Sequence, residues 1–228
     1  MITQIVMIST IFLLCWLGYE FLGRSKKTKY FSAKIFGFGL FFIALAILFY
    51  AVRDILVQFS LYGLQTKFLI IGGLIHIVGA YLILWFVSKE FGPRSYFKYL
   101  FYVLFGFVMI AFGLFLSGKV FKLASEIQQA PLEPFHYLVV RNYVFDPSGI
   151  LILYGLIILI SVLILGVILF NSLREKEKIL KIKGLLYGLG AWFLIAPMII
   201  CALVSPVFAR IGYLLGAILI YKAFKIKI

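Results

Sequence analysis

The chain has 228 residues, of which 64% are hydrophobic and only 13% are charged. A typical soluble domain is about half apolar and about one quarter charged. A chain of this size cannot hide so much apolar surface from water, so the composition excludes an ordinary soluble enzyme, a disordered chain and a disulfide-stapled secreted domain. It indicates a protein built from membrane-spanning helices.

Seven apolar runs lie between clusters of charged residues, and most are close to the length of about 20 residues that a helix needs to cross a bilayer. We therefore expect an all-α membrane protein that forms a single domain over residues 1–228. The expected spans are 2–22, 31–57, 68–87, 96–116, 149–170, 184–204 and 207–224.

Basic residues are distributed unevenly between the two sides of these spans. The loops after the first, third and fifth spans and the C-terminal tail together hold 16 of the 22 Lys and Arg residues. Basic residues stay on the cytoplasmic side, so the N-terminus is expected outside and the C-terminus in the cytoplasm of a multi-pass protein of the plasma (inner) membrane. The net charge of +14 is split among short segments, which favours contact with anionic lipid over nucleic-acid binding.

The first three spans resemble the last three, which predicts a parallel 3+1+3 repeat. The alternative is a chance match between apolar sequences of low complexity. Repeat one is expected over about 1–89, a linker helix over about 96–116, an outer loop over about 117–148 and repeat two over about 149–228. The matching residues are Gly37 and Gly39 with Gly188 and Gly190, and the segments 79–83 (GAYLI) and 216–220 (GAILI).

The expected outer loop carries two patterns of its own. Residues 119–129 show a helical apolar stripe, which predicts a short amphipathic helix. Residues 137–140 and 143–145 are rich in β-forming side chains around a two-residue break, which predicts a hairpin. Such a loop could either close an outward-facing cavity or simply cover the bundle.

His76 is the titratable residue of the third span and lies eight residues from its start, about 12 Å deep at 1.5 Å per residue. Titratable groups at this depth are candidate functional residues, although a histidine can also be structural and bond to a neighbouring helix. Pro197 interrupts the sixth span at a similar depth and could open space beside it. We take His76, Tyr81, Trp192 and Pro197 as a candidate ligand site, whose apolar character favours an apolar ligand or a lipid tail.

Three charged residues lie at the outer ends of the second and third spans. Arg53 and Asp54 close the second span and Lys67 opens the third, which predicts an ion cluster. Simple anchoring at the membrane interface is the alternative.

No pattern of catalytic or metal-binding residues is present. The sequence contains two His and eight acidic residues, and it has no nucleophile elbow, zinc-binding helix motif or phosphate-binding loop. We therefore expect no enzymatic activity, no catalytic residue, no metal site and no cofactor.

The whole-chain topology resembles two groups of membrane proteins. One is the seven-helix N-terminal sensor regions of histidine kinases, with the wider opsin-like arrangement, and the other is the SWEET sugar transporters. The resemblance rests on span number and orientation, so it assigns no functional residue. A pigment function is disfavoured because no lysine lies between Gly212 and Tyr221.

These features predict a non-enzymatic sensor or receptor-like module that signals to a cytoplasmic or membrane partner. The expected contact is the loop 171–183, in which residues 174–178 (REKEK) would continue the helix of the fifth span. The alternatives are a small-solute transporter with its site between the repeats and an accessory subunit of a larger membrane complex. The oligomeric state stays open.

Overall fold

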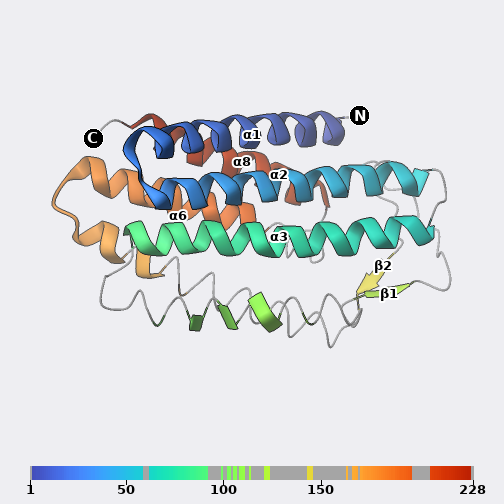
Figure 1. Cartoon of the computed structure of the whole chain (residues 1–228). Coiled ribbons are helices and arrows are strands. Elements are labelled where there is room, and N and C mark those ends of the chain that lie inside the picture. Colours follow the sequence, from blue (N-terminus) through green and yellow to red (C-terminus); the bar gives the residue numbers. More distant parts are fainter. Residues whose placement is uncertain are drawn as a thin grey trace.

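The computed structural model describes residues 2–58, 62–91, 166–168, 170–196 and 206–226, two short strands, and isolated positions between 99 and 163 (Figure 1). Long helices make up nearly all of this part of the chain. They are α1 (Ile2–Thr28), α2 (Phe31–Gln58), α3 (Tyr62–Phe91), α6 (Lys178–Ile195) and α8 (Pro206–Lys225).

Three of the helices are long and apolar enough to cross a membrane. They contain the segments Gln4–Thr28, Phe31–Leu56 and Ile71–Phe91, so the chain is a helical membrane protein. The expected spans 96–116 and 149–170 lie largely outside the described residues. The expected span 184–204 is described as far as residue 196.

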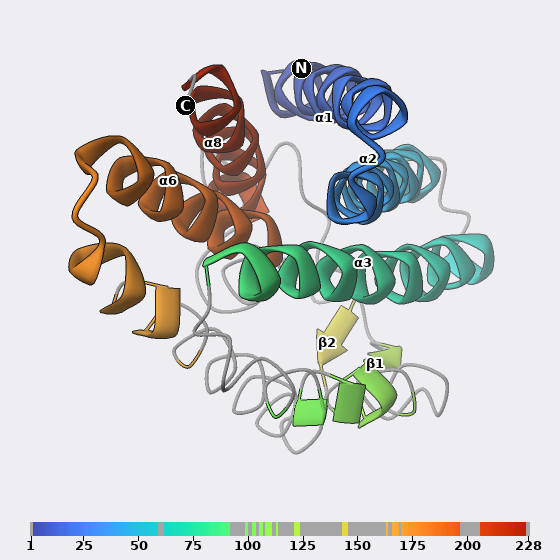
Figure 2. The same cartoon turned by 60° about the vertical axis from the view of Figure 1, so that its left-hand side comes forward.

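The helices form a bundle in which α2 packs against both α1 and α3, and α6 packs against α8 (Figures 1 and 2). The two groups meet where α8 touches α1 and α6 touches α3. Contacts between aromatic rings near the helix ends show in which direction each helix runs. Phe21 near the end of α1 lies against Phe86 near the end of α3 and Phe224 at the end of α8, with ring centroids 6.3 and 4.9 Å away. Helices α1, α3 and α8 therefore run parallel.

Helices α2 and α6 begin at the end of the bundle where those three helices finish. We name this end the basic end because it gathers most of the described Lys and Arg residues; the other is the opposite end. The residues at the basic end are Arg24, Lys26, Lys27, Lys29, Lys34, Lys89, Arg174, Lys176, Lys178, Lys181, Lys183, Lys222 and Lys225.

Glycines allow the backbones of paired helices to come into contact. A Cβ atom added at Gly39 of α2 would lie 3.2 Å from the carbonyl oxygen of Gly79 in α3. A Cβ atom at Gly190 of α6 would lie 3.1 Å from the carbonyl oxygen of Gly216 in α8. Small residues let helices pack closely where no hydrophobic force drives their association, so the glycine pattern serves packing within one chain.

The described strands change one expectation for the outer loop. Strand β1 (Phe121–Leu123) pairs antiparallel with β2 (Tyr143–Phe145). The helix expected over 119–129 is therefore wrong at 121–123, where pairing with another strand satisfies the backbone polar groups instead. The other expected hairpin strand, 137–140, lies outside the described residues.

The expected helical extension through residues 174–178 is also wrong. The helical residues end at Arg174, residues 175–177 form a bend, and α6 begins at Lys178. The chain must reverse here, because Gly184 packs against Ser172 and Gly188 packs against Ile168, as in antiparallel neighbours. A charged turn exposed to solvent allows that reversal.

Candidate functional site

An ion cluster at the opposite end of the bundle joins the two groups of helices. Asp54 near the end of α2 binds Arg53 through its Oδ1 atom, with the guanidinium Nη2 2.6 Å away, and it binds Arg210 of α8 through Oδ2. The side chains of Arg53, Asp54 and Arg210 are only 16, 10 and 7% exposed. Buried charges need such partners, because an unpaired charge in this position is very costly.

The cluster differs in one member from the set expected from the sequence. Arg53 and Asp54 are in contact, whereas Lys67 is exposed on α3 and Arg210 makes the interhelical contact with Asp54. Arg210 carries a charge inside the expected seventh span, and intramembrane charges are functional candidates by default. That signal could have identified it from the sequence.

His76 of α3 lies in the interior and is 2% exposed. Its Nδ1 atom is 3.2 Å from the hydroxyl oxygen of Tyr213 in α8, and its ring lies 6.2 Å from the ring of Tyr50 in α2. The carbonyl group of Leu194 in α6 faces the ring, but among the described residues none meets Nε2 with hydrogen-bond geometry. His76 therefore connects its own helix to α2, α6 and α8.

The ion cluster and the two tyrosines that contact His76 lie about one helical turn apart on α2 and α8. Tyr50 precedes Asp54 by one helical turn on α2, and Tyr213 follows Arg210 by about one turn on α8. Gly72 makes room for the Tyr50 ring, since a Cβ atom there would lie 2.8 Å from it. We name these polar residues the polar ladder: Tyr50, Asp54, His76, Arg210 and Tyr213.

Two of the other candidate ligand residues lie in the described part of the chain. Tyr81 is partly buried on α3, and Trp192 packs edge-on against Phe193 at 5.0 Å in α6. Pro197 lies outside the described residues, although α6 ends at Ile195, shortly before it. The partners Tyr50 and Tyr213 carried no sequence signal, because tyrosine is common in apolar spans.

An aromatic cluster closes the basic end of the bundle. Tyr187 of α6 lies at its centre, 5.7 Å from Phe36, 5.8 Å from Phe86 and stacked at 5.4 Å on Phe91. Five helices thus contribute rings to one cluster, and most of these rings meet in tilted or edge-on geometries, which are favourable. The members of the cluster are Phe21, Phe36, Phe86, Phe91, Tyr187 and Phe224.

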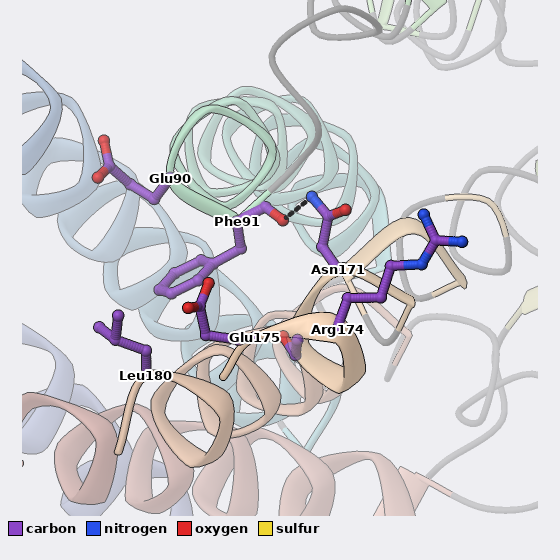
Figure 3. Close-up of a pocket in the computed structure, with 7 residues that line it drawn as sticks. Glu90, Phe91, Asn171, Arg174, Glu175 and Leu180 are labelled. Atoms are coloured by element: carbon purple, nitrogen blue, oxygen red, sulfur yellow. Dashed lines mark hydrogen bonds between the residues drawn. The ribbon is translucent and has the colours of Figure 1, made fainter. Parts of the chain in front are cut away.

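A cavity of about 370 Å³ opens beside this cluster, between the end of α3 and the segment 171–180 (Figure 3). The amide of Asn171 donates a hydrogen bond of 2.7 Å to the carbonyl oxygen of Phe91 and so fixes one wall. Figure 3 shows the carboxylate of Glu175 beside the Phe91 ring, while the side chain of Arg174 points away from it. The lining residues are Glu90, Phe91, Asn171, Ser172, Arg174, Glu175 and Leu180.

Glu90 at the rim of the cavity also holds the loop between α1 and α2. Its Oε2 atom accepts a hydrogen bond from the hydroxyl of Tyr30. Partial burial, this hydrogen bond and the negative charge of Glu90 raise the pKa of Tyr30 to about 12. Tyr30 therefore donates in its neutral form at physiological pH, and the loop is tied to the end of α3.

The arrangement offers polar contacts between helices. Among the described residues, no group of three or more His, Cys, Asp or Glu residues could hold a metal ion. Comparisons with protein-family models, with curated proteins and with solved structures found no match.

Proposed function

We propose that the chain is a seven-helix protein of the plasma membrane that acts as a non-enzymatic sensor or receptor-like module. Its N-terminus lies outside and its C-terminus lies in the cytoplasm. One observation carries the proposal: polar contacts link α2, α8 and α3 near one end of the bundle, and α3 continues from there to a cavity beside loop 171–183 at the other end. A signal received outside can therefore reach a cytoplasmic partner through packed elements.

The orientation is supported by the positions of the basic residues. The described basic residues of the loops after α1, α3 and residues 166–174 and of the C-terminal tail gather at one end of the bundle, as expected for the cytoplasmic side. The start of α1 and the end of α8 lie at opposite ends of the bundle (Figure 1), in keeping with an odd number of spans.

Cysteine labelling tests the orientation directly. Single cysteines at Lys27, Lys178 and Arg141, placed in a variant without Cys15 and Cys201, are exposed to a membrane-impermeant thiol reagent in intact cells. Only the cysteine at position 141 is expected to react, because the other two face the cytoplasm. Reaction at positions 27 and 178 but not at 141 would reverse the proposed topology.

The polar ladder provides a physical basis for coupling between the ion cluster and the cavity at the basic end. Asp54 holds Arg210, and Arg210 lies one turn from Tyr213, which binds His76 on α3. Helix α3 continues to Phe91, whose carbonyl group binds Asn171 at the cavity. An outside ligand that competes for the ion cluster would favour a different packing of α8 against α2 and α3, and so a different cavity.

The cytoplasmic contact of the module is the loop 171–183. Five of the seven residues that line the cavity belong to it. Charged side chains of this loop are exposed, so a protein partner can reach them.

The experiment that tests the function compares the two ends of the bundle. An environment-sensitive fluorophore on a cysteine at Leu180, which lines the cavity, reports on the cytoplasmic end in lipid nanodiscs. Asp54→Asn at the ion cluster is expected to shift its emission. Lys67→Gln, an exposed position at the same end of the bundle as Asp54, is the matched control and should leave the emission unchanged. Identical spectra for all three proteins would overturn the sensor proposal in favour of an accessory subunit.

A small-solute transporter is the second candidate, and one observation favours it. The bond between His76 and Tyr213 joins the two groups of helices within the bundle, the place where repeat transporters bind their substrates. A transporter would expose this site to each side in turn. A cysteine at Tyr213 that reacts with impermeant reagent from both faces of reconstituted vesicles would favour transport; one that reacts from neither would favour sensing.

A further inference from the structure

We infer that α2 with α3 and α6 with α8 are two copies of one helix pair, related by a pseudo-two-fold axis that passes between Phe36 and Tyr187 and between His76 and Tyr213. The axis runs along the bundle, so the copies are parallel in the membrane. This inference is independent of the signalling role, because it concerns how the two halves recognise each other.

The register between the copies follows from the glycines. A shift of 151 residues places Gly39 on Gly190, and a shift of 137 residues places Gly79 on Gly216. Under the first shift, the segment 36–43 (FGFGLFFI) matches 187–194 (YGLGAWFL). Under the second shift, 79–83 matches 216–220.

The two helix crossings involve the same atoms. A Cβ atom at Gly39 would meet Cγ1 and the backbone nitrogen of Ile83 at 2.9 and 3.2 Å. A Cβ atom at Gly190 would meet Cγ1 and the backbone nitrogen of Ile220, the equivalent residue, at 2.7 and 3.2 Å. Each crossing is therefore built on the same side-chain and backbone contacts.

The reverse contacts and the burial agree with this register. Gly79 packs on Ile43, and Gly216 packs on Leu194, which is the equivalent of Ile43. Many buried positions of one copy are also buried in the other, although Ser88 has an exposed equivalent in Lys225. Pairs that are buried in both copies include Ala33 and Gly184, Gly37 and Gly188, Leu40 and Ala191, Ala80 and Ala217, Phe86 and Ala223, and Val87 and Phe224.

Two residues contact their own equivalents, and this places the axis. Phe36 corresponds to Tyr187, and their rings lie 5.7 Å apart near the basic end. His76 corresponds to Tyr213, and the two share the hydrogen bond of 3.2 Å deeper in the bundle. Two helix pairs with similar crossings need not bring equivalent residues into contact. A two-fold axis between the pairs does so, because each residue on the axis meets its own equivalent.

The interface between the copies is therefore self-complementary close to the axis, like that of a two-fold homodimer, whereas farther from the axis α3 packs more extensively on α6 than α2 does on α8. The surface of one helix pair that carries Phe36 and His76 fits a second copy of the same surface. The ion cluster is an addition on one side, since Arg210 corresponds to Gly73 and has no charged counterpart.

A reciprocal exchange on the axis tests the inference in the full-length protein. Equivalent positions have equivalent surroundings, so the double variant His76→Tyr with Tyr213→His should rebuild the bond with the two partners exchanged by rotation about the axis. Each single variant is expected to lower the unfolding temperature in nanodiscs by about 3 °C or more, and the double variant should recover most of that loss. The control exchange is His76→Tyr with Tyr50→His. Tyr50 also contacts His76 but is not its equivalent. The losses in unfolding temperature of these two single variants should therefore add in the double variant.

Two results would contradict the proposed axis. A double variant that loses the sum of the two single changes, or that fails to fold while both singles fold, overturns the axis. If a single variant does not fold, the exchange Phe36→Tyr with Tyr187→Phe decides instead. It should be at least as stable as its less stable single variant, and an additive loss there overturns the inference.

Discussion

Gly190→Leu is expected to lower the unfolding temperature of the protein by several degrees. Two of the three atoms that a Cβ would meet belong to the backbone of α8, namely the Gly216 oxygen at 3.1 Å and the Ile220 nitrogen at 3.2 Å. Backbone atoms cannot rotate away, so the helices must separate along their contact. Overpacking of this kind costs about 3 kcal/mol, which corresponds to about 6–12 °C in a chain of this length.

The same change at Gly39 should have a similar effect, because that residue meets the corresponding atoms of α3. Thermal unfolding of the purified protein in nanodiscs measures both. Gly23→Leu is the matched control, because nothing lies within 4 Å of a Cβ atom added there. If Gly190→Leu were as stable as Gly23→Leu, the close crossing of α6 and α8 would be wrong.

Asp54→Ala is expected to destabilise the protein by about 3–5 kcal/mol, since it leaves the buried guanidinium of Arg210 without its carboxylate. The second change Arg210→Met should recover most of that loss, because it removes the unpaired charge and keeps an apolar side chain in place. Chemical or thermal unfolding of the single and double variants forms a double-mutant cycle that gives the coupling between the two residues.

Lys67→Ala provides the control for the ion cluster. Lys67 is exposed at the same end of the bundle, so its loss should change stability by no more than about 0.5 kcal/mol. Equal effects of Asp54→Ala and Lys67→Ala would mean that the buried pair between α2 and α8 contributes nothing specific.

The described helices show how well the pattern of apolar residues predicts the positions of helices. The expected spans 2–22 and 31–57 lie within α1 and α2, and 207–224 lies within α8. Charge clusters interrupt the apolar runs and therefore predict where helices leave the membrane, but not where they end. Helix α1 continues to Thr28, past its basic residues, because a helix satisfies its own backbone in water as well as in lipid.

The candidate site was predictable only in part. His76 and Asp54 stand out because polar groups in apolar runs are rare and costly. Their partners could not be predicted, since helical periodicity gives the faces of one helix and not the rotation of its neighbour. Arg210 therefore lies beside Asp54 where Lys67 was expected, and Tyr213, which was not expected, shares a hydrogen bond with His76.

The sequence by itself determined the class of this protein, because a chain with so few charges can only place its apolar helices in lipid. It also determined where helices can approach closely, since only glycine leaves room for another backbone. The tertiary structure alone decided which helices use that room and which polar groups meet. Those pairings join residues 137 and 156 positions apart, as with Tyr213 and His76 or Arg210 and Asp54. They depend on the packing of whole helices, which no local pattern encodes.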